Sequence, residues 1–331
     1  MKLRSILATA AIAVLSSICA IGSAALAETL RLAHHHAVGG QVDIAAKKFA
    51  ELAKEYSKGE ITIQVFPAAQ LGQEREALDL VNQGAIDVSI TSTPILDKLY
   101  PPMAATSTPL IFKSWEHARK LYKGEFGQGL IAGVRDNSDV EVLGFIHLGF
   151  RDLMFKGEAP TTLAGMQGKR MRSPENFVWI RMFELMGAKP TPVTWGEVYT
   201  AMQTGVAEGL DTSAAAGLDM KFNEVTSSLL KTQHMFGSML FAMNKAKLAA
   251  LSPEQQEIIK KAAVDTGDYV DLEVNIPAEN AAYGKLEAAG IKVVEPANPQ
   301  EWRDAMAPLQ AEIAERNPGA DKFIEMAKSA E

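Results

Sequence analysis

Basic side chains gather in one short stretch of an otherwise acidic chain. Residues 168–174 read GKRMRSP, with Lys169, Arg170 and Arg172 around a methionine, and Arg151 stands upstream in LGFRDL. A guanidinium binds a carboxylate through two parallel hydrogen bonds, a geometry that lysine cannot reproduce. Arg172 ends a predicted strand just before Ser-Pro, so it could face an interior crevice. The stretch indicates a site for one anionic ligand; the alternative is a set of edge charges that deter aggregation.

Three consecutive histidines form a second candidate site. His34, His35 and His36 end the first predicted strand, and crevices of α/β proteins form at the carboxyl ends of strands. Neighbouring residues on a strand point to opposite faces, so only His34 and His36 could share a metal ion. A solvated loop, a contact with a small ligand and a metal site all stay open for the triplet. We predict no metal ion and no cofactor.

Motifs of the common enzyme classes are missing from the sequence. It contains no Gly-x-Ser-x-Gly elbow, no His-Glu-x-x-His and no phosphate loop, and AVGGQVD lacks the spaced glycines of a dinucleotide site. Acidic residues are numerous, so counting does not exclude a carboxylate pair, but the spacing singles out none. We therefore predict a protein that is not an enzyme.

The N-terminal residues have the three parts of a secretory signal. Lys2 and Arg4 precede an uncharged run, and Ala25–Ala27 forms an Ala-x-Ala end before Glu28. A membrane-spanning helix, the alternative, needs roughly 20 strongly apolar residues, and this run is rich in Ala and Ser. The single cysteine, Cys19, lies inside the signal. The mature chain is thus expected to lack disulfides and thiolate sites.

Length and charge narrow the function classes. The chain has 331 residues and a formal net charge of −7, and removal of a signal with two cations and no acid takes the charge to −9. Nucleic-acid binders gain affinity mostly by neutralising phosphates, so we predict no nucleic-acid partner. About 300 residues exceed the usual size of a single core, so two lobes are expected.

Alternating strand and helix patterns predict an α/β protein with a mainly parallel sheet. Strands are predicted over residues 29–36, 60–66, 85–91 and 140–149 in a first unit and over 169–173 and 206–213 in a second. Helices are predicted over 41–56, 72–84 and near 114–136 in the first unit and over 176–186 and 195–204 in the second.

One unusually long helix is predicted near the C-terminus. Ser252 can cap it, Pro253 suits the first helical position and Gln255 completes a capping box. No strong stop follows until Gly290, so the helix would span roughly 55 Å, more than one small lobe needs. We expect it to cross both lobes with a kink at Pro277, and we expect the lobes to be joined by short crossings.

Several segments, in order, resemble the solute-binding proteins of TRAP transporters, the DctP-type family. They are FAELAKEYSKGEITIQVFPAAQLGQEREALDLVNQGAIDVSI, GFRDLMF…GMQGKRMRSP, LMGAKPTPVTWGEVYTAMQTGVAEGLD and LSPEQQEIIKKAA. The resemblance implies a periplasmic binding protein with two α/β lobes (type II-like), a hinged cleft and a long helix spanning both lobes. The expected division is a signal peptide over 1–27, lobe I over 28–148 plus about 237–277, and lobe II over about 149–236 plus 278–331.

The resemblance also assigns ligand contacts to positions in this chain. The family arginine that pairs with a ligand carboxylate, in Lys-x-Arg-x-Pro, falls on Arg172, and a second family arginine, in Gly-x-Arg, falls on Arg151. The other residues expected at the cleft are His35, His36, Glu74, Ser92, Glu175, Trp195, Asp211 and Thr212.

This chain departs from the family pattern at some of these positions. Thr212 stands where an Asn is common, Trp195 is larger than the usual Phe, and Glu175 lies where a neutral residue is common. A carboxylate near an anion site raises the free-energy cost of binding the anion, unless that carboxylate pairs with a hydroxyl or a cation. We therefore expect an organic acid with one carboxylate and an apolar, aromatic or hydroxylated remainder. Alternatively, Trp195 belongs to the core and Asp211 only caps the helix that follows.

The resemblance implies that the bound acid is delivered to the small and large membrane subunits of a TRAP transporter, which use an ion gradient. A binding protein for an ABC importer or a sensor kinase is one alternative, with the same pocket and a different partner. A periplasmic hydrolase that uses acidic residues is another.

Overall fold

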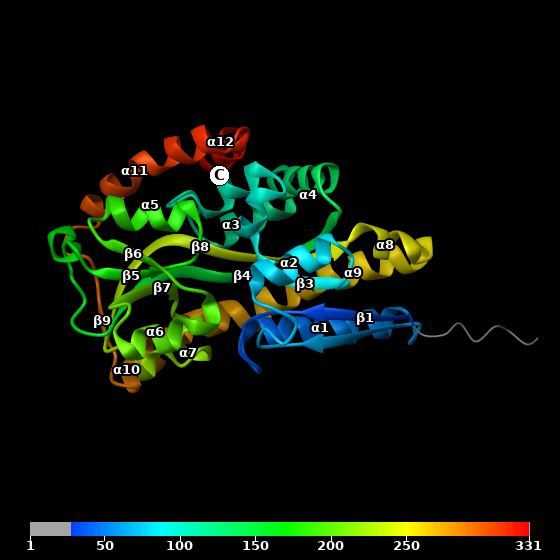
Figure 1. The fold of residues 1–331 in the computed structure, drawn as a ribbon, viewed down its shortest axis with the longest axis horizontal. Coiled ribbons are helices and arrows are strands. Elements are labelled where there is room, and N and C mark those ends of the chain that lie inside the picture. Colours follow the sequence, from blue (N-terminus) through cyan, green and yellow to red (C-terminus); the bar gives the residue numbers. More distant parts are fainter. Residues whose placement is uncertain (1–27, 331) are drawn as a thin grey trace, which may run out of the picture.

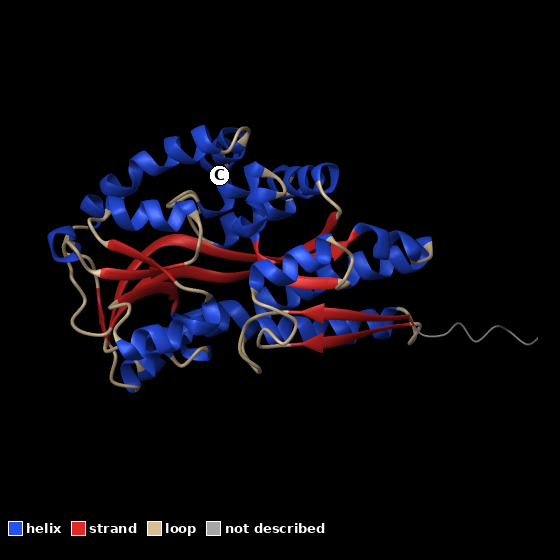
Figure 2. Cartoon of the chain, in the orientation of Figure 1, coloured by secondary structure: helices blue, strands red, loops and turns tan. Residues whose placement is uncertain are grey.

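A mixed sheet runs the length of the molecule and carries helices on both faces (Figures 1 and 2). The computed structural model describes residues 28–330, so the predicted signal over 1–27 lies outside the described residues. The strand order is β2-β1-β3-β8-β4-β7-β5-β6, and β9 pairs with β8. The strands are β1 Glu28–Ala33, β2 Ile61–Phe66, β3 Val88–Ser92, β4 Val140–Phe155, β5 Arg170–Ser173, β6 Lys189–Pro192, β7 Gly209–Ser213, β8 Ser228–Asn244 and β9 Lys292–Val294.

The helices begin and end close to the predicted positions where the apolar period is strong. The helix predicted over 41–56 is found as α1 with those bounds, because its buried side chains recur at helical spacing. The α-helices are α1 Gln41–Tyr56, α2 Glu74–Asn82, α3 Trp115–Lys123, α4 Glu125–Asn137, α5 Phe177–Leu185, α6 Val198–Thr204, α7 Ala214–Asp219, α8 Lys245–Ala250, α9 Pro253–Tyr269, α10 Ile276–Ala288, α11 Pro299–Arg316 and α12 Ala320–Ser329.

Two long antiparallel strands, β4 and β8, connect the two halves of the sheet. They pair from Val140 with Asn244 to Phe155 with Ser228, and their register shifts between His147 and Gly149. Both strands are buried on both faces, which explains their nearly continuous apolar sequences. The two halves are thus joined directly by β4 and β8, without a long linker, and share one continuous sheet.

The sheet is parallel at its two ends and between β8 and the short strand β9. Strand β1 is parallel to β2 and β3, and β5 is parallel to β6 and β7. The central pairs β3 with β8, β8 with β4, and β4 with β7 are antiparallel. The α/β prediction is confirmed, and the mainly parallel sheet is corrected to a mixed one because β4 and β8 occupy its centre.

The long C-terminal helix crosses both halves, as predicted. It begins with the expected capping box of Ser252 and Gln255, and α9 packs on β4 and α1, whereas α10 packs on α7 and β9. A π-helical segment, Val270–Asn275, joins α9 to α10. This irregularity ends just before Pro277, whose ring nitrogen cannot donate a helical hydrogen bond.

The hydrophobic core divides differently on the two faces of the sheet. On one face, α1 and α9 cover β1 and β3, whereas α6, α7 and α10 form a separate cluster with β7. On the other face, one cluster includes side chains of α2 to α5, α11 and α12. Helix α12 packs on α4 and on the 3-10 segment Pro101–Ser107. The expected division assigns residues 278–331 to lobe II, but α12 packs on elements that lie within residues 28–148.

Between residues 28 and 330, every helix is too short or too polar to cross a membrane.

Candidate binding site

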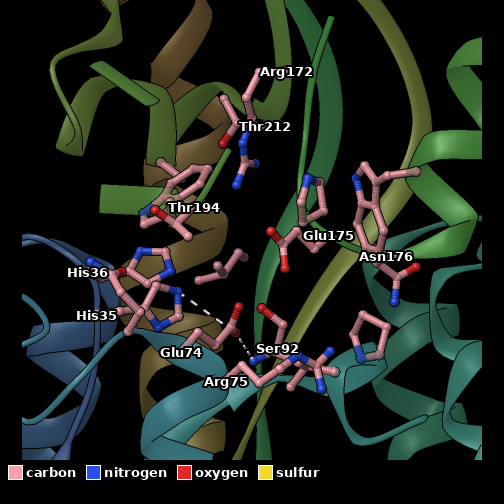
Figure 3. Close-up of a pocket in the computed structure, with 18 of the residues that line it drawn as sticks. His35, His36, Glu74, Arg75, Ser92, Arg172, Glu175, Asn176, Thr194 and Thr212 are labelled. Carbon is pink, nitrogen blue, oxygen red and sulfur yellow. Dashed lines mark hydrogen bonds and ion pairs between the residues drawn. The ribbon is translucent and has the colours of Figure 1, made fainter. Parts of the chain in front are cut away.

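A cavity of about 170 Å³ lies where strand ends of the two sheet halves meet (Figure 3). By the same measure a water needs about 10–15 Å³, so the cavity has room for on the order of ten waters, the size range of one small organic molecule. Ser92 ends β3 on one side, and Arg172 and Thr212 lie near the ends of β5 and β7 on the other. The carboxyl ends of the parallel strands thus build the site, as expected for α/β crevices.

Arg172 is a buried cation that faces the cavity (Figure 3). Its side chain and backbone are only 3% exposed, its Nε donates to the carbonyl of Val193 at 2.9 Å, and its guanidinium lies 5.4 Å from the ring centroid of Trp195. No acidic side chain of residues 28–330 forms an ion pair with it. Burial lowers the pKa of Arg172 to about 10, although the charges of Asp211 and Glu74 act in the opposite direction. The guanidinium is therefore charged at neutral pH and has no ion-pair partner within the described residues.

Arg151 also lines the cavity, but the protein holds it firmly. Its Nε donates to Oδ2 of Asp211 at 2.5 Å and its Nη2 donates to the Asp211 carbonyl at 2.8 Å. The guanidinium lies 5.5 Å from the ring centroid of Trp179. Because two donors are already bound, the orientation of the guanidinium is set before a ligand arrives.

Asp211 lies behind Arg151 and does not line the cavity, so its predicted place among the ligand contacts is corrected. Its Oδ2 also accepts from Nε1 of Trp179 at 2.9 Å and lies 3.6 Å from Nε2 of His234. Burial opposes ionisation of this carboxyl, but the charge of Arg151 and hydrogen bonds hold its pKa well below the ordinary value. Successive residues of a strand alternate between faces, and Thr212 takes the cavity side. Asp211 therefore positions Arg151.

His35 and His36 line the cavity from the loop that follows β1. Their rings lie 4.6 Å apart, and the ring of His36 lies 5.3 Å from that of Trp195. Burial lowers the pKa of both histidines. Both rings are thus neutral at pH 7, so they add hydrogen-bonding atoms without adding positive charge.

His34 turns away from the cavity. Its Nε2 lies 3.3 Å from Oδ1 of Asp43, and burial lowers the pKa of His34 to about 4. The strand ends at Ala33, so strand alternation does not govern the triplet, and His34 and His36 do not face a common site. Nowhere in the described part of the chain do three His, Cys, Asp or Glu side chains group as a metal site would require.

Glu74 supplies a negative charge at the opposite side of the cavity from Arg172 (Figure 3). Its Oε1 accepts from the backbone N–H of Ser92 at 2.6 Å and from Oγ1 of Thr91 at 3.2 Å, and it lies 3.8 Å from Nε2 of His35. Burial opposes ionisation, but the hydrogen bonds from Ser92 and Thr91 hold the pKa of Glu74 below its ordinary value. The cavity thus has the guanidinium groups of Arg172 and Arg151 at one side and the carboxylate of Glu74 at the other, where Arg75 also lines the wall.

Two buried donors on the cavity wall have no partner within residues 28–330. They are Oγ1 of Thr212 and Nε1 of Trp195. Buried polar groups in proteins are nearly always hydrogen-bonded, so unpaired ones in a cavity indicate that a ligand or water completes them. Trp195 thus lines the cavity as well as packing on Phe222, so the two interpretations of this residue are compatible.

Nine of the ten predicted site residues line the cavity, with Asp211 as the exception. Glu175 is among the nine and is exposed to solvent. The sequence interpretation missed several polar and aromatic wall residues because they lie in turns, at a strand end and in first helical turns that carry no periodic signal. These residues are Gln73, Asn176, Trp179, Thr194 and Ser213.

Comparison with known proteins identifies the family. The family model described as bacterial extracellular solute-binding protein, family 7 (DctP), matches residues 32–317. The 2,3-diketo-L-gulonate-binding periplasmic protein YiaO of Escherichia coli (strain K12) is 30% identical over 306 residues, which cover 92% of each chain.

Solved structures agree with this match. A TRAP periplasmic solute-binding protein from Roseobacter denitrificans with bound β-D-glucuronate has a TM-score of 0.87 at 27% identity, and the match covers 92% of this chain and 100% of that one. A TRAP periplasmic solute-binding protein from Sulfitobacter sp. NAS-14.1 with bound β-D-galacturonate also has a TM-score of 0.87, at 26% identity and with the same coverage. The resemblance seen in the sequence and the two-lobed α/β fold are thus confirmed: this chain belongs to family 7 of the bacterial extracellular solute-binding proteins, the DctP family, and is a solute-binding protein of a TRAP transporter.

Proposed function

We propose that this protein captures a sugar acid with a single carboxylate in the periplasm and delivers it to the small and large membrane subunits of a TRAP transporter. The observation that carries the proposal is the buried Arg172 guanidinium, which faces the cavity and forms no ion pair with any of residues 28–330. The acids bound by the three relatives named above share one carboxylate on a hydroxylated carbon skeleton.

The two arginines suit the carboxylate end of such a ligand. Arg172 can donate two parallel charge-assisted hydrogen bonds to the carboxylate. Arg151 is already oriented by Asp211, so it adds a further donor with little additional loss of side-chain entropy. Both interactions strengthen when closure of the two halves excludes water, because the effective dielectric constant falls.

The opposite side of the cavity suits hydroxyl groups rather than a second carboxylate. Glu74 can accept hydrogen bonds from hydroxyls and would repel another negative group. Arg75 also lines this side, but its charge already interacts with that of Asp97. The neutral rings of His35 and His36 and the free hydroxyl of Thr212 add polar contacts. The Trp195 ring adds an apolar wall for the C–H face of a sugar. These features support a hydroxylated monocarboxylate over a C4-dicarboxylate.

A thermal-shift screen followed by titration calorimetry tests this proposal. D-glucuronate and D-galacturonate should stabilise the protein, by about 2.7 kcal/mol at a hundredfold excess over Kd, and succinate should not. Arg172→Lys loses the fork and should bind about 10- to 150-fold more weakly, since a hydrogen bond to a charged group contributes about 1.5–3 kcal/mol. Arg170→Lys, an exposed neighbour on the same strand, is the matched control.

Two results would contradict the proposal. One is near-unchanged affinity in Arg172→Lys; the other is stabilisation by succinate with none by the sugar acids. The proposal also includes capture without chemistry, so the acid recovered from the purified protein after long incubation should have an unchanged mass.

A further inference from the structure

Helix α1 lacks an N-terminal cap from its own half of the molecule. Gly40 occupies the N-cap position, and no side-chain cap is formed there. Instead the first helical N–H, that of Gln41, donates to Oδ2 of Asp219 at 2.9 Å. Asp219 ends α7, 178 residues further along the chain. A carboxylate from one half of the molecule therefore occupies the cap position of a helix in the other half.

The two helices belong to separate hydrophobic clusters. Side chains of α1 such as Val42 and Phe49 pack with β1, β3 and α9. Side chains of α7 such as Ala214 pack with β7, α6 and α10. The bond between Gln41 and Asp219 thus joins the two halves on the face of the sheet where their cores are distinct. Helix α7 directly follows β7, so its first residues also line the ligand cavity.

The close approach requires glycine at position 40. A Cβ built on Gly40 would lie 2.9 Å from Oδ2 of Asp219 and 3.2 Å from its Cβ. The backbone at Gly40 is extended, with φ −78° and ψ 176°, a conformation that any residue adopts. Glycine at this position is therefore explained by space for Asp219 and not by backbone conformation.

The same glutamine also contacts the long helix. Nε2 of Gln41 donates to Oδ1 of Asn275 at 3.0 Å, and Nδ2 of Asn275 donates to the carbonyl of His147 at 2.6 Å. Asn275 ends the π-helical segment, and His147 adjoins a register shift in β4. Gln41 thus touches both the facing half, through Asp219, and the irregular region of the connecting elements.

We propose that Asp219 is a latch that forms when the two halves close on a ligand and must break before the ligand leaves. This inference rests on the proposed capture of a ligand by closure of the cleft. The carboxylate satisfies an otherwise uncapped amide and lies at the positive end of the α1 dipole. An N-cap residue contributes about 0.5–2 kcal/mol, which corresponds to about 2- to 30-fold in affinity.

Binding of D-glucuronate and D-galacturonate to Asp219→Ala and Asp219→Asn provides the first test. Asp219→Ala should lower the affinity about 2- to 30-fold, mainly through faster dissociation, because most effects of interface mutations lie in the off-rate. Asp219→Asn keeps an acceptor oxygen and should stay within about twofold of the wild type, since Asn and Asp cap about equally well. The control Asp136→Ala removes an exposed carboxylate of α4 and should change neither quantity.

Unchanged affinity and dissociation rate in Asp219→Ala would overturn the latch. An equal loss in both Asp219 variants would also overturn it, because the cap would then not be the cause. The melting temperature of the ligand-free protein checks that the variants fold.

A crosslink tests the latch by a measurement that does not depend on ligand affinity. The described residues contain no cysteine, and the Cβ positions at 40 and 219 are close to the roughly 3.5–4.5 Å separation of a disulfide. The double variant Gly40→Cys/Asp219→Cys should form an intramolecular disulfide on mild oxidation, faster with a bound sugar acid, whereas Gly40→Cys alone should not. Absence of the crosslink would refute the latch even if sugar acids bind. If the crosslink forms but neither acid binds, the sugar-acid proposal fails and the latch stands.

Discussion

Replacement of Arg172 by methionine should stabilise the ligand-free protein while it greatly weakens ligand binding. Burial lowers the pKa of Arg172 from an ordinary value above 12 to about 10. At about 1.4 kcal/mol for each pKa unit, this corresponds to a cost of about 3 kcal/mol for keeping the charge buried at the cavity. Because the folded pKa is the lower one, the cost is fully present below pH 10 and disappears only as the pH rises above the unfolded value.

Methionine removes this charge and also removes two favourable contacts. The hydrogen bond to the Val193 carbonyl and the contact with the Trp195 ring contribute about 1–2 kcal/mol together. The net gain in the free energy of unfolding is thus about 1–2 kcal/mol, an upper value because an open cleft hydrates the guanidinium. At about 2–4 °C per kcal/mol, the melting temperature should rise by about 2–8 °C.

Thermal and urea unfolding of the ligand-free protein at pH 7 measures this change, and titration with D-glucuronate and D-galacturonate measures binding. Loss of one partner of a buried charge pair lowers affinity by about 30- to 5,000-fold. Arg170→Met is the control, because Arg170 is exposed and pairs with Glu208. A variant Arg172→Met that is less stable than wild type, or that binds a sugar acid equally well, would refute the reasoning.

Two further predictions concern the elements that connect the halves. Burial raises the pKa of Asp152, which accepts hydrogen bonds from Tyr283 and Gln233, to about 7. The free energy of unfolding should therefore fall as the pH rises from about 4 to 7, and Asp152→Asn should reduce that fall when urea unfolding is measured across this range. An equal pH dependence in the variant and the wild type would contradict the assignment. Gly149 has φ +88°, and an added Cβ would meet the carboxyl of Glu279. Gly149→Ala should therefore lower the free energy of unfolding by more than about 1 kcal/mol. Equal stability of the variant and the wild type in urea unfolding would contradict this prediction.

Sequence patterns predicted local elements well where the signal is periodic or chemical. Helix α1 has the bounds expected from its apolar spacing, and the capping box of Ser252 and Gln255 begins α9 as expected. Strand β8 was missed. Its apolar residues, buried on both faces, do not alternate, so the sequence has no period of two to detect.

The candidate site could be predicted by residue type and by resemblance, but its internal geometry could not. Arg172 and Arg151 both line the cavity, yet one is unpaired and the other is held by Asp211. Trp179, which comes from another element, also donates to the Asp211 oxygen that accepts from Arg151. No spacing along the chain encodes such a meeting of β4, β7 and α5.

The sequence by itself determined the α/β class, the long capped helix, the family and most of the residues around the cavity, because helical period, capping chemistry and family motifs are properties of neighbouring residues. Tertiary structure alone decided which arginine is free, where Asp211 points, and that Asp219 lies at the start of α1. These outcomes depend on strand pairing and on contacts between residues as far apart as Gln41 and Asp219, where folding, and not sequence proximity, brings the groups together.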